Sequence, residues 1–123
     1  MSKLLQTFIF GLIFSCRLVP LDVKTISIYN KGVEFAWDEQ KRLANLAKHG
    51  LDFLDAPAVF ASPMVITPDR RRAYPEERWA ALGKLRGMVV YLAYTWRGDQ
   101  TRIISLRRAS RKERRIYEEK IPD

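Results

Sequence analysis

A long apolar segment in the C-terminal half of the chain constrains the fold more than any other feature. Met88–Trp96 (MVVYLAYTW) is rich in β-branched and aromatic side chains, which favour a strand. Arg97, Gly98 and Asp99 follow and are typical of a hairpin turn, and Thr101–Arg107 is largely apolar again. These two segments predict a pair of antiparallel strands, so the chain must contain a sheet with at least one buried face.

A short strand and a helix are predicted before this hairpin. Val33–Trp37 (VEFAW) alternates between apolar and other residues, as a half-buried strand does. Asp38 is a good N-cap for a helix that continues to His49, and Gly50 suits the left-handed position that ends a helix. The expected apolar stripe of this helix is Leu43, Leu46 and Ala47.

Shorter elements fill the middle of the chain. A second helix is predicted to reach Ala61 and to begin near Asp55, or with a distorted first turn, because Pro57 is tolerated only at the start of a helix. Three further segments follow: strands over Met64–Thr67 and Glu77–Leu82, and a turn over Gly83–Gly87. The order predicts an α+β fold with a short N-terminal strand, two helices, an antiparallel sheet of three to four strands and a C-terminal helix.

Residues 1–32 differ from the rest of the chain. A positive start at Lys3 and the apolar stretch LLQTFIFGLIF have the outline of a signal peptide, although polar residues interrupt the apolar run. The run is too short for a transmembrane helix. Three interpretations stand: an export signal, a disordered or loosely docked extension, or a gene start assigned too far upstream, with Val33 as the true start. We expect the folded domain over residues 33–123.

The composition limits the possible chemistry. Hydrophobic residues make up 47% of the chain and charged residues 29%, which excludes a disordered protein and fits one globular domain. Cys16 and His49 are the single cysteine and histidine, too few for an internal disulfide or for a zinc site of four nitrogen and sulfur ligands. The sequence has no Walker loop, G-x-G-x-x-G or G-x-S-x-G motif. We therefore expect a function without a metal or another cofactor.

Positive charge is concentrated near the C-terminus. The chain carries a formal net charge of +8, and residues 102–117 (RIISLRRASRKERRIY) contain several arginines and a lysine but one acidic residue, Glu113. This density is typical of a protein that binds a polyanion such as RNA, or an acidic partner protein. Ser110 and Glu113 also form an S-x-x-E capping box, which predicts a helix there. The apolar side of this helix is expected to be Ile116, Tyr117 and Ile121.

Several motifs occur in a fixed order along the chain. Residues 35–60 fit the pattern F-x-W-D-x-x-K-x-x-x-N-x-x-K-H-G-x-x-F-x-x-A-x-x-V-F. The later motifs are Asp69-Arg70, Tyr74, Glu76–Trp79, Leu82-Gly83, Arg102–Ser105, Arg107, Ala109, Arg111, Glu113-Arg114 and Tyr117-Glu118. Together, over about residues 33–121, they resemble the BrnT toxin family of type II toxin–antitoxin modules.

This resemblance implies a RelE-like ribonuclease fold and a toxin that cleaves RNA and inhibits translation. It also implies a BrnA-like antitoxin protein that forms a hetero-oligomer with the toxin. DNA would be contacted only through the antitoxin complex, at the promoter of the pair.

Metal-free cleavage of RNA uses the ribose 2′-OH as the nucleophile, and it needs a base, an acid and cations around the phosphate. Arginine suits the phosphate because its planar guanidinium binds two oxygens at once. Histidine titrates near neutrality, although a histidine in the last turn of a helix is about as often a simple cap. The predicted catalytic residues are His49, Tyr74, Arg78, Arg102 and Arg107. The predicted substrate-binding residues are Lys48, Arg70, Arg108 and Arg111.

Strand alternation sets conditions on this site. Glu77 and Arg78 lie on opposite faces of the strand predicted over Glu77–Leu82, and Arg78 is the one expected to share a face with the arginines of the last strand. Arg102 and Arg107 are five residues apart, so they lie on opposite faces of a regular strand and share a face only if a bulge intervenes. Tyr94 and Trp96, on the neighbouring strand, are expected to belong to the core.

Two other functions stay open at this point. The chain can be a non-catalytic basic module that holds RNA or an acidic antitoxin, in which case binding is salt-sensitive but the RNA stays intact. It can also be an exported or membrane-anchored protein, if residues 1–32 are a true signal. The main expectation is a cytoplasmic endoribonuclease toxin with no membrane association.

Overall fold

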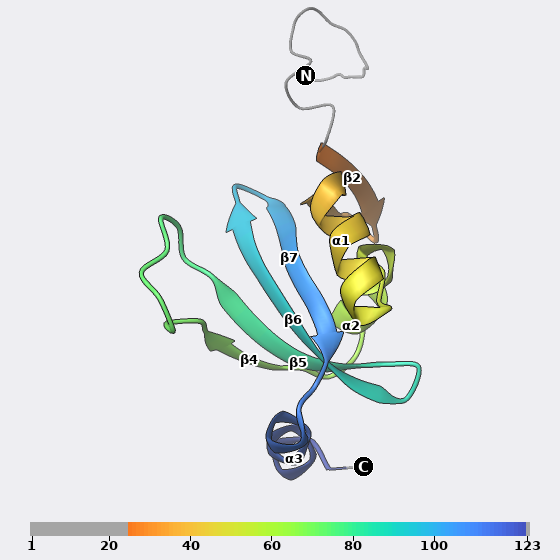
Figure 1. Cartoon of the computed structure of the whole chain (residues 1–123), viewed down its shortest axis with the longest axis vertical. Helices are drawn as coiled ribbons and strands as arrows, with labels where there is room; N and C mark the ends of the chain where they lie inside the picture. Colours follow the sequence, from red (N-terminus) through yellow and green to blue (C-terminus); the bar gives the residue numbers. More distant parts are fainter. Residues whose placement is uncertain (1–24, 123) are drawn as a thin grey trace, which may run out of the picture.

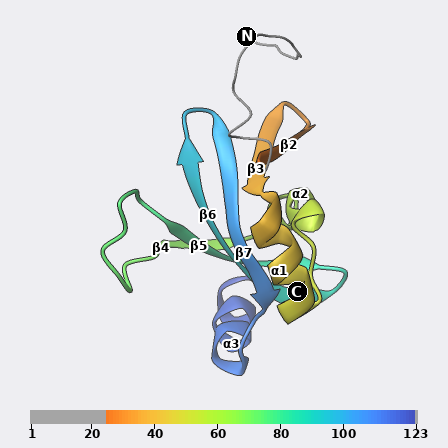
Figure 2. The same cartoon turned by 45° about the horizontal axis from the view of Figure 1, so that its top comes forward.

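The computed structural model describes residues 25–122, which form one mixed sheet with helices on both faces (Figures 1 and 2). The strands are β2 (Thr25–Asn30), β3 (Val33–Asp38), β4 (Val65–Pro68), β5 (Trp79–Leu85), β6 (Met88–Arg97) and β7 (Gln100–Arg108). The helices are α1 (Glu39–His49), the 3-10 helix η2 (Phe53–Asp55), α2 (Ala56–Phe60) and α3 (Arg111–Lys120).

The spatial order of the strands is β2-β3-β7-β6-β5-β4. Neighbouring strands are antiparallel except β3 and β7, which are parallel. The α+β class is confirmed, but the prediction of three to four antiparallel strands was too low for this six-stranded sheet.

The sheet begins before the predicted boundary at residue 33. β2 pairs with β3 along its whole length, from Thr25 opposite Asp38 to Asn30 opposite Val33. The turn between them uses two residues with positive φ, at 53° and 83°, a backbone that matches the right-handed twist of a hairpin. The signal-like segment lies in residues 1–24, outside the described residues.

α1 takes over the place of β3 beside β7. β3 pairs with β7 only over residues 34–36, and the chain then enters α1 after its N-cap, Asp38. Further along, the side-chain amide of Asn45 accepts from the N–H of Leu106 at 3.2 Å and donates to the Leu106 carbonyl at 2.7 Å. This one buried side chain therefore satisfies the backbone groups that a neighbouring strand satisfies elsewhere in the sheet.

The predicted apolar stripe of α1 was wrong. Leu43 and Leu46 are 50% and 37% exposed, and Ala47 is exposed as well. The inward positions hold Asn45 and Arg42 instead, and the Arg42 guanidinium bridges Glu39 and a residue beyond the helix. The reason is that α1 packs against the polar edge of β7, where hydrogen-bonding groups are needed more than apolar ones.

Two apolar clusters lie on the two faces of the sheet. On one face, α1, η2 and α2 lie over a core that includes Trp37, Phe53, Leu92, Tyr94 and Leu106. On the other face, called the α3 side below, α3 covers Leu82, Val89, Tyr91 and Ala93 with its buried Tyr117. The predicted capping box between Ser110 and Glu113 is confirmed at the start of α3. The predicted apolar side of α3 is confirmed as well.

Two local predictions need correction. The turn predicted over Gly83–Gly87 is wrong for its first three residues, because β5 continues to Leu85 and only the last two positions turn. Gly83 is required within the strand since a Cβ there would lie 2.8 Å from the Val59 side chain. Trp96 was expected in the core but is 52% exposed, because it lies on the outer end of β6, beyond the cover of α2.

Candidate functional site

A bulge in β7 decides which arginines share the α3 side of the sheet. Ile104 has no partner in the register between β7 and β6. Cross-strand partners share a face, and Arg102 pairs with Thr95 while Arg107 pairs with Tyr91. Thr95 and Tyr91 are four residues apart on β6, and so they point to the same side. The bulge therefore brings Arg102 and Arg107 onto one face.

Arg78, Thr95 and Arg102 form a row across three neighbouring strands, which we call the open row. Arg78 lies one residue before β5, and the Thr95 hydroxyl donates to the adjacent Glu77 carbonyl at 2.6 Å, which fixes this end of the loop to β6. Neighbouring strands are about 4.8 Å apart, so the backbones of Arg78 and Arg102 are about 10 Å apart. Their side chains are long enough to meet one anion over Thr95.

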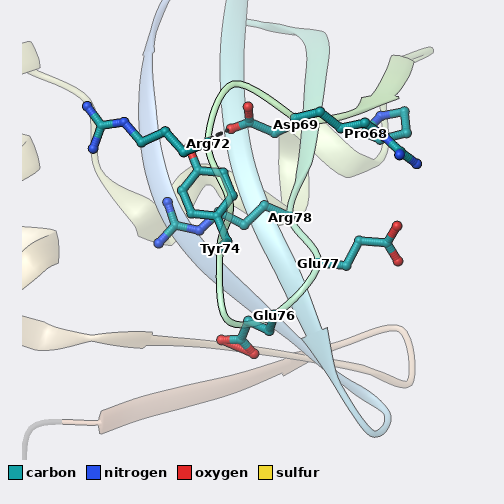
Figure 3. A pocket seen from close by; sticks show the side chains of 8 residues that line it. Pro68, Asp69, Arg72, Tyr74, Glu76, Glu77 and Arg78 are labelled. Atoms are coloured by element: carbon teal, nitrogen blue, oxygen red, sulfur yellow. Dashed lines mark hydrogen bonds between the residues drawn. The ribbon is translucent and has the colours of Figure 1, made fainter.

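The loop before β5 encloses a hollow of about 290 Å³ beside the open row (Figure 3). The Arg78 guanidinium carbon lies 4.1 Å from the centroid of the Tyr74 ring, a cation–π contact. The Tyr74 hydroxyl donates a long hydrogen bond, 3.5 Å, to Asp69. Glu77 points away from this pair, as strand alternation predicts (Figure 3). The lining residues are Pro68, Asp69, Arg70, Arg72, Tyr74, Glu76, Glu77 and Arg78.

The open row carries more positive than negative charge. Glu76 pairs with Arg97 at 2.8 Å. That hydrogen bond, with smaller contributions from the nearby Arg102 and Arg78, holds the pKa of Glu76 below its usual value. Among the residues that the structure describes, neither Arg78 nor Arg102 forms an ion pair with a carboxylate. Together with the Arg97–Glu76 pair, the open row therefore has three guanidinium groups and one carboxylate around it, and this excess of positive charge attracts an anion.

At the other end of the same face, under α3, two arginines are each paired with a carboxylate. Arg71 pairs with Asp69 at 2.9 Å, and Arg107 pairs with Glu113 at 2.8 Å. The Arg107 guanidinium also lies 4.0 Å from the centroid of the Tyr91 ring. The hydrogen bond from Arg107 lowers the pKa of Glu113 to about 2, so this carboxyl is ionised at neutral pH. Arg71 and Arg107 are therefore both held by carboxylates.

The remaining predicted residues are spread over several elements. His49 and Lys48 end α1, which lies beside β7 and away from the loop before β5 in both views (Figures 1 and 2). No hydrogen bond, ion pair or ring contact among residues 25–122 joins them to the open row. Arg70 lines the hollow, Arg108 is exposed at the end of β7, and Arg111 is exposed in the first turn of α3.

Sequence reasoning missed two residues of this face. Tyr91 lies within a strand so apolar that nothing marks it as different from a core residue, and it is 8% exposed. Arg71 was not expected in the site, yet it pairs with the buried Asp69 and lies 5.9 Å from the Tyr91 ring centroid. The period of two along β6, which places Tyr91 with Ala93 and Thr95, was the available signal.

Metal ligands are not gathered anywhere in the described part of the chain, where no three His, Cys, Asp or Glu side chains are placed to hold an ion. None of the helices within residues 25–122 has the length and apolar character to cross a bilayer.

A family model described as ribonuclease toxin, BrnT, of type II toxin–antitoxin system matches residues 37–113, which is more than half of the chain. The chain belongs to this family. BrnT proteins are ribonuclease toxins, and a type II system pairs each toxin with an antitoxin protein. The match runs from the end of β3 to the first turn of α3, so it includes both ends of the face described above. A search of curated proteins gave no match.

Proposed function

We propose that this protein is an endoribonuclease that cleaves RNA by attack of the ribose 2′-OH on the adjacent phosphate, needs no metal, and thereby inhibits translation. The BrnT family gives the general activity. The observation that carries the finer proposal is the open row, in which Arg78 and Arg102 approach each other on one face with no carboxylate partner among the described residues.

In this proposal the scissile phosphate lies between Arg78 and Arg102. Two preorganised guanidinium groups stabilise the negative charge that grows on the phosphoryl oxygens in the transition state. Tyr74 is assigned as the acid for the leaving 5′-oxygen, because its ring lies under the Arg78 guanidinium and its side chain lines the hollow. Arg107 is kept as a flanking contact. His49 ends α1, away from the open row, so the base is left unassigned in this proposal, and a His49→Gln variant should keep wild-type activity.

The proposed partner is a BrnA-like antitoxin in the cytoplasm. The family implies an antitoxin protein, and a net charge of +8 favours one with an acidic toxin-binding surface. The toxin would then meet DNA only through the antitoxin. Lys48, Arg70, Arg108 and Arg111 remain proposed contacts to the flanking RNA.

The test compares Arg102→Ala with Arg115→Ala. Both variants lose one positive charge, but Arg115 is exposed on α3, and helical periodicity places it opposite the buried Tyr117. Induced expression should arrest growth for the wild type and Arg115→Ala, while Arg102→Ala should cleave RNA at least about 100-fold more slowly. Cleavage by the wild type should persist in EDTA. Equal activity of the two variants contradicts the assignment, and RNA that is bound but intact after long incubation favours the non-catalytic module.

A further inference from the structure

A second cavity, of about 190 Å³, lies under α3 on the same face of the sheet. Its walls are mainly apolar, and its lining residues are Val65, Thr67, Ala80, Leu82, Tyr91, Glu113 and Ile116. The cavity is smaller than the usual range of about 300–1,000 Å³ for drug-sized ligands. It is large enough for a single flat ring.

The rim of this cavity differs from the open row in its charge. The arginines beside it, Arg71 and Arg107, are each paired with a carboxylate. A phosphate would have to displace Asp69 or Glu113, so the rim does not favour an anion. A neutral, flat group that buries apolar area fits the cavity better.

Tyr91 offers such a group a polar contact. The residue is 8% exposed and lines the cavity, and its hydroxyl is not among the fully buried polar atoms without a partner that the described residues contain. A phenolic hydroxyl both donates and accepts, so the Tyr91 side chain can form a hydrogen bond with a polar edge of a group that enters the cavity. Thr67, on the edge strand β4, adds a second hydroxyl at the opening.

The cavity lies within reach of an RNA held on the open row. Tyr91 is four residues along β6 from Thr95, which is about 13 Å in a strand. Both lie on the α3 side of the sheet, and no helix covers the part of the face between the open row and α3 (Figures 1 and 2). An RNA strand can therefore lie along this face with a phosphate at one end and a base at the other.

We propose that the cavity under α3 binds one nucleobase of the RNA whose phosphate lies on the open row, with the Tyr91 and Thr67 hydroxyls as its polar contacts. The inference rests on the proposed function, since it extends the same RNA path. It makes the cavity the part of the face that reads sequence, while the open row reads only the backbone.

The test uses two tryptophan variants on one strand. Thr67→Trp fills the opening of the cavity, whereas Ile66→Trp places the same side chain one residue earlier, on the opposite face of β4. Both positions are exposed on an edge strand, so both variants should fold, and thermal unfolding checks this. Each protein is titrated with a set of uncleavable 2′-O-methyl RNA oligonucleotides in which a single abasic residue occupies each position in turn.

For the wild type and Ile66→Trp, the abasic residue should weaken binding about tenfold at one position of the set. For Thr67→Trp that position should lose its effect, because the cavity is already filled. An abasic profile of Thr67→Trp that equals the wild-type profile overturns the inference. Loss of antitoxin binding in Thr67→Trp with an unchanged abasic profile also overturns it, and assigns the cavity to a protein side chain.

Cleavage of ordinary RNA, measured beside the titration, separates the two proposals. If the wild type cleaves ordinary RNA but an abasic residue weakens its binding at no position of the set, the base site is overturned and the proposed function still stands. The expected abasic profile without cleavage supports the base site and contradicts the proposed catalytic activity.

Discussion

The α3 side of the sheet uses arginine in opposite ways at its two ends. In the open row, Arg78 and Arg102 have no carboxylate partner among the described residues, whereas near α3 the guanidinium groups of Arg71 and Arg107 bind carboxylates at 2.9 and 2.8 Å. Each end also has an arginine over a tyrosine ring, at 4.1 Å for Arg78 and 4.0 Å for Arg107. The arginine–tyrosine pairs are thus alike at the two ends, and the ends differ in whether carboxylates bind the arginines.

This difference teaches that the number of arginines on a surface is a poor measure of its affinity for phosphate. A guanidinium that already binds a carboxylate must give up charge-assisted hydrogen bonds before it can bind another anion. Near α3 such pairs stabilise the fold, because Glu113 also accepts from the Ser110 N–H at the start of the helix. The open row contributes less to the fold and keeps its charge for a ligand.

The largest effect is expected when the open row is given a carboxylate of its own. Ser105 pairs with Ala93 on the α3 side, between the two ends. Ser105→Glu should therefore neutralise Arg102 or Arg78 and slow RNA cleavage about a thousandfold, without removing any guanidinium. Ser105→Gln has the same size without the charge and should lose less than about tenfold. Initial rates on one RNA substrate measure both, and equal rates for the two variants would show that the unpaired charge is not what matters.

A smaller effect is expected from the two tyrosines. Tyr74→Phe keeps the ring under Arg78 and removes only the hydroxyl, so the cleavage rate should fall about a hundredfold if that hydroxyl acts as the acid. Tyr91→Phe makes the same change under Arg107 and should cost less than about tenfold, through binding alone. Single-turnover rates at saturating protein separate the two effects. A Tyr91→Phe variant that cleaves more slowly than Tyr74→Phe would contradict the proposal, because it would place the chemistry near α3 and not at the open row.

Much of the fold was predictable because its signals are local. The caps Asp38 and Gly50 set both ends of α1, and the Ser110–Glu113 box sets the start of α3. The inward face of α1 was not predictable, because its apolar spacing looks like a core stripe. What decides its orientation is the hydrogen bonding of Asn45 to a strand 61 residues further along the chain.

The candidate site was predictable by residue type but not by geometry. Tyr74 and Arg78 were expected in it, and they lie together in the hollow. Whether Arg102 and Arg107 share a face depended on a bulge at Ile104, which arises from pairing with β6 and has no local signal. The division into unpaired and paired arginines likewise depends on carboxylates that come from other segments.

The structural role of the carboxylates can be compared between the two ends by removing one carboxylate from each end in turn. Glu113→Gln should lower the free energy of unfolding by about 2 kcal/mol, since it breaks charge-assisted hydrogen bonds to a half-buried Arg107 and weakens the cap of α3. Glu76→Gln removes the partner of Arg97, but that pair is exposed and should contribute less than about 1 kcal/mol. Urea unfolding at pH 7 compares the two. A larger loss for Glu76→Gln would contradict the structural role given to the α3 end.

The smallest expected effect is the pH dependence of the same pair. The folded pKa of Glu113 is about 2, below the 4.5 of an unperturbed glutamate, because Arg107 donates to its ionised form. Protons therefore bind the unfolded chain first, so the stabilisation is complete above about pH 4.5 and is lost as the pH falls toward 2. The gap in unfolding free energy between wild type and Glu113→Gln should narrow by about 1 kcal/mol from pH 6 to pH 3, with allowance for partial exposure of the pair. A gap that stays constant over this range would mean that Glu113 acts through its size or its capping bond, and that the charge of the α3 end is not what holds Arg107 in place.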